Sequence, residues 1–441
     1  MKEPKKLFYL SLIVACLLIF GYFFNGESYF TVIFKQPLFI KHNRYHVNCK
    51  AIINNDEEEI KKAENILKSL ILKDGYIRQS LDSDFIIEKS QCDYYKKTRG
   101  YYRHKSVDAD YPLGVTILAH ESAEQLERLL RTLYQPQNIY CIHVDKKSDE
   151  NLHKSIKSIA DCFDNVFIAS ETYDIVYLGF SRLKAEFQCL KDLLMLDKLK
   201  NIEKHPNLIG KKVVDWKYAF NYVGTEFPLI TNRDLVKILK MYNGSNEIQV
   251  IPERFQHRYY NRFKEDFRNY KIHITNQLNP PPPNGYKISK GFASYVISRK
   301  FAEYAVFDPR SLSLFNWLKY TLGPEELFWS TLQFNTHIYS DHGFEDLSLS
   351  ESSLLRYSGW YPYYECKGII RHEMCVFGIR DLPNILKNRT EYLINKFMLN
   401  VDPIAYQCME EWFDEKEKAK SNLNFDFYCN FIKARSKLAN C

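Results

Sequence analysis

The chain of 441 residues lacks the glycine-rich motifs that identify two large classes of nucleotide-binding enzyme. Neither a GxGxxG dinucleotide fingerprint nor a GxxxxGK[ST] phosphate loop occurs in it, which disfavours an oxidoreductase and a kinase. The chain also lacks a block of Lys and Arg residues. Its net charge is only +7, with basic and acidic residues interspersed, so we expect no nucleic-acid partner.

A stretch without any charged residue, 7–24, stands near the start of the chain. At 1.5 Å per residue, a helix of that length spans about 27 Å, close to the hydrocarbon core of a bilayer. Lys2, Lys5 and Lys6 precede it and favour a cytoplasmic N-terminus. The stretch ends in the bulky Tyr22-Phe23-Phe24 without a small-residue cleavage site. This favours a membrane anchor over a cleaved signal peptide, which would make the protein secreted.

We therefore expect a single-pass type II protein of the Golgi membrane, with its catalytic part in the lumen. The pattern divides the chain into a cytoplasmic tail over 1–6, an anchor over 7–24, a lumenal stem over 25–111 and a lumenal catalytic domain over 112–441. The stem is charged and irregular, and one helix is predicted in it, over 56–72.

Paired-cysteine motifs are missing as well. The chain has eleven cysteines but no CxxC, so a structural zinc site is not expected. Ten of the cysteines follow the anchor and would form disulfides in an oxidising lumen, although spacing alone does not assign the pairs. Sequons at Asn243 and Asn388 are available for N-glycosylation in the same compartment.

Predicted strands and helices alternate after Pro112, which indicates an α/β domain with a parallel, right-handed sheet. Ligands of such sheets bind beyond the carboxyl ends of the strands, where His120 and Asp145 fall. Asp145 could instead be a turn or N-cap residue. The predicted strands cover 113–120, 138–145, 165–169 and 216–223, and the predicted helices cover 121–134, 151–159 and 181–194.

An Asp-x-Asp metal motif does not follow any of these strands. The two matches in the chain, Asp82-Ser83-Asp84 and Asp108-Ala109-Asp110, fall in the predicted stem. Many sugar-nucleotide transferases use such a motif to hold a divalent metal against the diphosphate. If the donor is a UDP-sugar, cationic side chains must neutralise the leaving diphosphate instead, so we expect no metal cofactor.

Four segments resemble the core 2 / I-branching β-1,6-N-acetylglucosaminyltransferases: 138–145 (NIYCIHVD), 165–170 (NVFIAS), 323–329 (GPEELFW) and 378–382 (GIRDL). The resemblance extends over roughly 49–412. It implies a GT-A fold, which is Rossmann-like with a parallel or mixed sheet, and a metal-independent, inverting enzyme of the Golgi. The implied reaction transfers GlcNAc from UDP-GlcNAc to the 6-hydroxyl of GalNAc or Gal in the O-glycans of glycoproteins, as from core 1 to core 2.

The resemblance also implies roles for single residues on the donor side. Glu326 occupies the position of the catalytic base, which must accept the proton of the attacking hydroxyl. Alternatively, Glu326 and the neighbouring Glu325 only cap a helix after Pro324. His120 and Asp145 resemble uridine-binding positions. The diphosphate-neutralising positions correspond to Lys396 and to His372, although a shift of one residue would give the second role to Arg371.

The acceptor side resembles the family less closely. Glu247 and Arg258 match acceptor-contacting positions, and Tyr357 replaces a tryptophan. Phe255 stands where a lysine is expected. Two alternatives therefore stay open: an enzyme of the same fold that uses UDP-Xyl or UDP-Glc, and a catalytically silent glycan-binding or scaffolding relative.

The disulfides implied by similarity are Cys49–Cys408, Cys92–Cys162, Cys141–Cys189 and Cys366–Cys375. Cys429 and Cys441 are left over. They could bond to each other, or one of them could link two chains into a homodimer.

Overall fold

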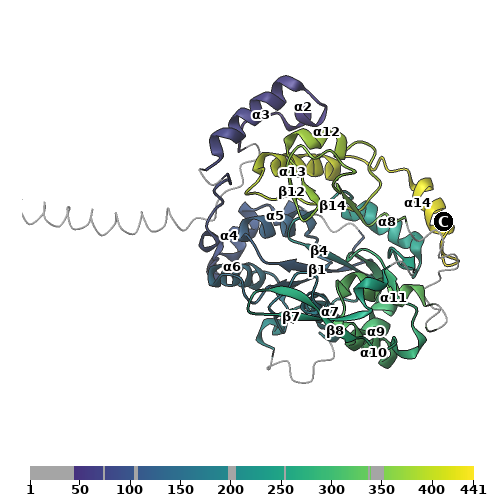
Figure 1. Ribbon diagram of the computed structural model, residues 1–441. Coiled ribbons are helices and arrows are strands. Elements are labelled where there is room, and N and C mark those ends of the chain that lie inside the picture. Colours follow the sequence, from purple (N-terminus) through teal and green to yellow (C-terminus); the bar gives the residue numbers. More distant parts are fainter. Residues whose placement is uncertain are drawn as a thin grey trace, which may run out of the picture. The chain divides into compact units, whose positions relative to one another are not determined.

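The central sheet of the computed structural model has five strands in the order β10-β4-β1-β2-β3 (Figure 1). Strands β1, β2, β3 and β4 are parallel, and β10 runs antiparallel to β4. Their bounds are β1 Leu113–Ala119, β2 Ile139–Val144, β3 Val166–Ile168, β4 Tyr218–Val223 and β10 Val296–Ser298. Every residue of β1 and β2 is buried, as expected for parallel strands that are covered on both faces. The predicted mixed α/β architecture is thus confirmed.

The structure describes residues 44–72, 75–103, 108–196, 205–252, 255–335, 338 and 352–441. The predicted cytoplasmic tail and anchor lie outside these residues, as does the start of the predicted stem up to residue 43. Within the described ranges, no helix combines the length and the apolar character needed to cross a membrane.

Helices cover both faces of the central sheet. Alternate residues of β2 show the two sides: Tyr140 and Ile142 pack into one hydrophobic core and Ile139 and Cys141 into the other. The first core includes α5 (Ala123–Leu133), α6 (Glu150–Asp161), α8 (Asn232–Tyr242) and α14 (Phe425–Lys433). The second includes α7 (Phe180–Met195), α9 (Arg299–Phe307), α10 (Pro309–Trp317) and α11 (Pro324–Phe334).

Side-chain caps fix where the helices of the first core begin. Ser122 accepts a hydrogen bond from the backbone N–H of Gln125, Asp149 from that of Asn151, and Thr231 from that of Asp234. Each cap satisfies a backbone donor that has no partner inside the helix.

A second, three-stranded sheet has the order β11-β14-β5. Its strands are β5 (Glu226–Pro228), β11 (Arg356–Ser358) and β14 (Leu393–Asn395). A third hydrophobic core joins this sheet to α2 (Cys49–Ile53), α3 (Glu57–Leu70), α12 (Leu382–Ile385) and α13 (Pro403–Lys418). The remaining elements are α4 (Cys92–Thr98) and the strands β6 (Ile251–Pro252), β7 (Asn261–Asp266), β8 (Lys271–Leu278), β9 (Ser289–Lys290), β12 (Ile369–Arg371) and β13 (Met374–Val376).

The part of the predicted stem that the structure describes packs against the rest of the body. One compact unit runs from Lys41 to Cys441, so the body does not begin at residue 112. The charged residues of α3 lie on its outer face, whereas its Ile60 and Ala63 are buried. Arg99 is also buried, and its Nε donates to Glu127 of α5 at 3.0 Å.

The structure contains the four disulfides that the resemblance implies: Cys49–Cys408, Cys92–Cys162, Cys141–Cys189 and Cys366–Cys375. It also pairs the two cysteines that were left over as Cys429–Cys441. In this pairing neither cysteine has a free thiol, so neither can form a disulfide that links two chains into a homodimer.

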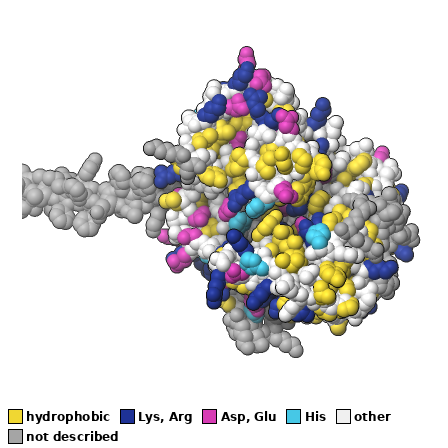
Figure 2. Space-filling view, in the orientation of Figure 1, with side chains coloured by type: hydrophobic (Ala, Val, Ile, Leu, Met, Phe, Trp, Pro, Cys, Tyr) yellow, Lys and Arg dark blue, Asp and Glu magenta, His cyan; other side chains and the backbone are white. Residues whose placement is uncertain are grey.

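Basic side chains are not gathered into a continuous track on the face shown in Figure 2. Lys and Arg side chains there are interspersed with Asp and Glu side chains and with apolar ones. This mixture agrees with the modest net charge of the chain.

Candidate functional site

A cavity of about 400 Å³ lies where β1, β2 and β4 end. Open α/β sheets bind ligands at this edge. His120, Asp145 and Val223 line it from the strand ends, and Glu326 lines it from the start of α11. Segments from the C-terminal part of the chain close it, with Arg356, Trp360, Arg371, His372, Asn395 and Lys396 among their lining residues. The structure therefore brings all the predicted catalytic and donor residues into one cavity.

Asp145 forms the floor of one end of this cavity. Its Oδ1 accepts hydrogen bonds from the backbone N–H groups of Lys147 (3.3 Å) and Ile175 (3.2 Å), and its Oδ2 pairs with the Lys147 ammonium. Lys147 Nζ also lies 4.8 Å from the ring centroid of Tyr270, another lining residue. Asp145 thus holds a turn, which the sequence had left open as its role. Together with Lys147 it also lines the cavity, where a ligand can meet the ion pair.

His120 is linked to the opposite wall through Glu121. Its Nε2 lies 3.1 Å from Glu121 Oε1, and Arg371 Nη2 lies 3.3 Å from the same oxygen. The contact with His120 and the charge of Arg371 lower the pKa of Glu121 to about 2. Glu121, which the sequence analysis did not single out, therefore stays ionised and positions both side chains.

Lys396 lies beside Arg371, with its Nζ donating to the Arg371 carbonyl oxygen at 3.2 Å. Burial, together with the positive charges of Arg371 and Arg356, lowers the pKa of Lys396 to about 8. The ring of His372 stacks on Tyr177 with centroids 4.8 Å apart. Burial and the charges of Lys396 and Arg371 lower the pKa of His372, so this imidazole is neutral at neutral pH.

Two further arginines that line the cavity were not predicted. Arg356 Nη1 lies 3.2 Å from Glu226 Oε1, and Arg182 reaches the cavity from α7. Together with Lys147, Arg371 and Lys396 they give the cavity five Lys and Arg side chains. The sequence signal for Arg356 was weak: it is a single arginine after the buried Leu354 and Leu355.

Glu326 lies in the first turn of α11, which begins at Pro324 after Gly323. Gly323 has φ +64°, and a Cβ at this position would lie 2.6 Å from Arg258 Nη1, so the turn requires glycine. Arg258 Nη1 donates to Glu326 Oε2 at 2.6 Å, and Lys290 Nζ lies 3.3 Å from the same oxygen. Both cations contact one carboxylate oxygen of the candidate base.

Lys290 compensates for the lysine that Phe255 replaces. It comes from β9, and its Nζ lies 5.1 Å from the ring centroid of Phe255. An ammonium favours such a position over an aromatic face. The positive charge expected at position 255 is thus supplied from a strand 35 residues later in the chain.

Glu325 also lines the cavity, and its carboxylate belongs to a buried charge cluster. Its Oε1 lies 3.5 Å from Arg182 Nη1, and Arg182 Nε lies 3.6 Å from Glu186 Oε1. Burial raises the pKa of Glu186 to about 8 and raises that of Glu325 as well. One arginine therefore faces two buried carboxyl groups beside Glu326, and of the neighbouring pair Glu326 has the more exposed side chain, at 21% against 1% for Glu325.

The predicted acceptor residues do not line this cavity. Arg258 lies next to it through its contact with Glu326. Glu247 is buried, with its carboxylate accepting hydrogen bonds from Ser353 and Leu354 on Oε1 and from the Tyr242 hydroxyl on Oε2. Tyr357 packs under the guanidinium of Arg389, at 4.2 Å from its ring centroid. Trp360, three residues later, does line the cavity, as do Tyr177 and Tyr270.

Among the described residues, no group of three or more possible metal ligands lies in this cavity. Asp82 accepts a hydrogen bond from the backbone of Ala123 and Asp84 from that of Leu81. Asp108 pairs with Lys240. In the described part of the chain, the one such group is Cys366, Cys375 and Asp381, and its cysteines form a disulfide.

Comparison with known proteins agrees with this arrangement. The family model described as "Core-2/I-Branching enzyme" matches residues 115–202 and 206–386. The human protein named beta-1,3-galactosyl-O-glycosyl-glycoprotein beta-1,6-N-acetylglucosaminyltransferase 3 is 34% identical over 387 residues, which cover 84% of this chain and 83% of the human protein. A transferase of bovine herpesvirus 4 (strain DN-599) with the corresponding name is 32% identical over 391 residues, covering 84% of this chain and 82% of its own.

Proposed function

Because the chain belongs to the Core-2/I-branching enzyme family, we propose that it is an inverting β-1,6-N-acetylglucosaminyltransferase with a GT-A-type fold. The donor is UDP-GlcNAc, and the acceptor is the 6-hydroxyl of GalNAc or Gal in O-glycans of glycoproteins. The observation that carries the proposal is the placement of the Glu326 carboxylate in the same cavity as Lys396, Arg371 and Arg356. Such a site can remove a proton on one side and stabilise a leaving diphosphate on the other.

The proposed reaction is a single displacement. The acceptor 6-oxygen attacks C1 of GlcNAc, the bond between C1 and the diphosphate oxygen breaks, and Glu326 takes the hydroxyl proton. In the described part of the chain, hydrogen bonds and ion pairs to Glu326 are made to Oε2, which leaves Oε1 for this proton. Lys396 and Arg371 stabilise the charge of UDP as it leaves, in the role that a metal ion has in other transferases. His120 and Asp145 hold the uridine.

The same family membership supports a Golgi location, with residues 7–24 as the anchor and the body in the lumen. The five disulfides agree with an oxidising compartment.

The deciding experiment is a transfer assay on the lumenal chain from Asn25 to Cys441, carried out in EDTA. UDP-GlcNAc, UDP-Glc and UDP-Xyl are each offered with Galβ1-3GalNAc-aryl, and the linkage of the product is mapped. A β-1,6-linked GlcNAc product confirms the proposal. Transfer from another donor assigns the site to a different sugar, strict dependence on Mn²⁺ contradicts the metal-free mechanism, and absence of transfer to this and related acceptors points to a silent relative.

The lowered pKa of Lys396 predicts a pH dependence of donor binding. Below about pH 8 its amine is protonated and attracts the diphosphate, and above that pH it loses the proton and the attraction. We expect the Kd for UDP, measured by calorimetry, to rise about tenfold between pH 7 and pH 9.5. Lys396→Gln should bind UDP weakly at both values, and it also controls for titration of the uracil. A parallel rise in both proteins would contradict the role of Lys396.

Arg371 and His372 can be separated by substitution. Arg371→Gln should weaken UDP binding by about 10- to 100-fold, because a hydrogen bond between charged groups contributes about 1.5–3 kcal/mol. His372→Asn should change it by less than about threefold, because a neutral imidazole contributes no net charge. Equal losses in the two variants would mean that the loop presents both side chains to the diphosphate.

Because Lys290 supplies the charge that is expected at position 255, we predict that a substitution at one position can compensate for a substitution at the other. Lys290→Met removes one of the two cations on Glu326 Oε2 and should lower kcat/KM about tenfold. Adding Phe255→Lys should restore part of that loss by returning the charge to the position where the family has it. Phe255→Leu on the same background is the matched control and should restore nothing.

A further inference from the structure

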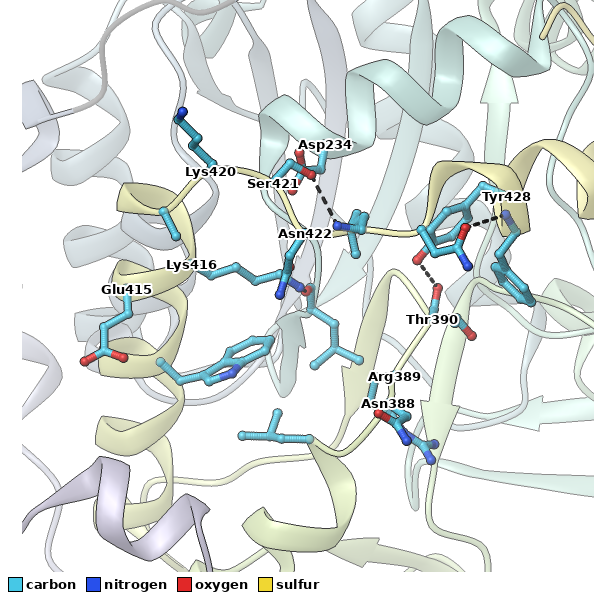
Figure 3. A pocket seen from close by; sticks show the side chains of 17 residues that line it. Asp234, Asn388, Arg389, Thr390, Glu415, Lys416, Lys420, Ser421, Asn422 and Tyr428 are labelled. Carbon is cyan, nitrogen blue, oxygen red and sulfur yellow. Dashed lines mark hydrogen bonds between the residues drawn. The ribbon is translucent and has the colours of Figure 1, made fainter.

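A second cavity, of about 700 Å³, lies away from the catalytic residues (Figure 3). Its walls come from the end of α13, the start of α14, the segment between them and the segment 386–390. Asp234 of α8 lies at its upper edge in the view of Figure 3. Its size is within the range of about 300–1,000 Å³ that is usual for ligand sites.

The lining of this cavity combines aromatic rings with amides, hydroxyls and charged side chains of both signs. Trp412 is half-buried and Phe427 is 38% exposed, so both rings present surface to the cavity. Asn422 and Lys416 reach toward its middle, whereas Glu415 points away (Figure 3). Aromatic faces pack against the C–H faces of pyranose rings, and amides bond to their hydroxyl groups, so this lining suits a carbohydrate.

Asn388 lies on the rim of the same cavity and begins the sequon Asn388-Arg389-Thr390. Its side chain is exposed, and its amide forms no hydrogen bond with any of the described residues. The other sequon differs in this respect, because Asn243 Nδ2 donates to the Leu438 carbonyl oxygen at 3.0 Å. Asn388 is therefore the sequon whose amide is unengaged and next to a cavity suited to sugars.

We propose that Asn388 carries an N-linked glycan whose first GlcNAc residues fold back into this cavity. The proposal rests on the lumenal location proposed above. The linkage forms when Asn388 Nδ2 displaces a lipid diphosphate from C1 of an oligosaccharide donor and loses one proton. Once docked, the glycan contacts α13, α14 and the segment before β14 together, and thereby holds the C-terminal helix against the body.

The test uses the full-length chain, made in mammalian cells that attach uniform oligomannose glycans and purified in detergent. Endoglycosidase H is added to the native protein, and release at each sequon is followed by mass spectrometry of peptides. We expect release at Asn388 to be at least about tenfold slower than at Asn243, because a docked glycan must first leave the cavity. After denaturation and reduction the two rates should be equal.

A substitution in the cavity then separates docking from general shielding. Phe427→Ala should speed release at Asn388 without changing release at Asn243, and Tyr363→Ala, at a 94% exposed residue outside the cavity, should change neither. Equal native rates at the two sequons would overturn the proposal. A glycan at Asn243 with Asn388 empty would overturn this proposal but leave the lumenal location standing, whereas two empty sequons would count against both.

Discussion

Glu326→Gln is expected to lower kcat by roughly two to four powers of ten, because the amide cannot accept the proton of the attacking hydroxyl. UDP affinity should be unchanged, since the cationic side chains assigned to the diphosphate, Arg371 and Lys396, are untouched. Turnover is measured with UDP-GlcNAc and acceptor, and affinity is measured by calorimetry with UDP alone.

Two further variants control this result. Glu326→Asp keeps a carboxylate but moves it back by one methylene, and should recover part of the activity. Glu58→Gln makes the same chemical change at an exposed residue of α3 and should have no effect. Near-normal turnover of Glu326→Gln would refute the base assignment, and a matching loss of UDP binding would show that the substitution disturbs the cavity.

Arg182→Met is expected to lower the free energy of unfolding by about 3–5 kcal/mol, because it leaves buried carboxyl groups without their cation. Glu325 and Glu186 both face Arg182 from fully buried positions. Urea unfolding followed by fluorescence measures the loss. Because Glu325 lies in the first turn of α11 beside Glu326, the variant should also lower kcat by displacing Glu326.

The loss caused by Arg182→Met should depend on pH. The pKa of Glu186 is already raised to about 8 in the folded protein, against 4.5 for an ordinary glutamate. Between these values the unfolded chain gives up a proton that the folded chain retains, so stability falls as pH rises. Without Arg182 this fall should be steeper, and the two proteins should differ more at pH 8 than at pH 5.

A double variant tests the pairing itself. Adding Glu186→Gln to Arg182→Met should recover part of the lost stability, because one of the two stranded carboxyl groups is removed. An additive or larger loss would show that Arg182 acts through packing alone.

Much of the α/β half could be predicted because its signals are local. Each of the buried strands 113–120 and 138–145 is a continuous apolar run, and the structure has β1 and β2 there within one residue at each end. The edge of a parallel sheet where ligands bind follows from the strand order, which places His120 and Asp145 together. Glu326 and Lys396 could be placed only through the family resemblance, because no local pattern connects them to that edge.

What the sequence did not predict depends on contacts between distant segments. Lys290 reaches Glu326 from β9 and replaces a charge expected at position 255, and periodicity carries no information about such an exchange. Arg356 and Arg182 looked like ordinary basic residues, because their approach to the cavity is set by tertiary packing of β11 and α7. The packing of the described part of 44–111 against the body was not predicted for a related reason. The outer face of α3 is charged, and the disulfides that hold this region join it to cysteines far along the chain.

The Cys49–Cys408 bond limits how the protein can be shortened for production. The two cysteines are separated by 359 residues, and Cys49 lies close to the first residue that the structure describes. A truncated form that starts at residue 112 would leave Cys408 and Cys162 as free thiols and remove Arg99 from the buried Glu127. Free thiolates attack other disulfides and rearrange them. A secretable version should therefore begin upstream of Arg44, although most of the catalytic residues lie far downstream.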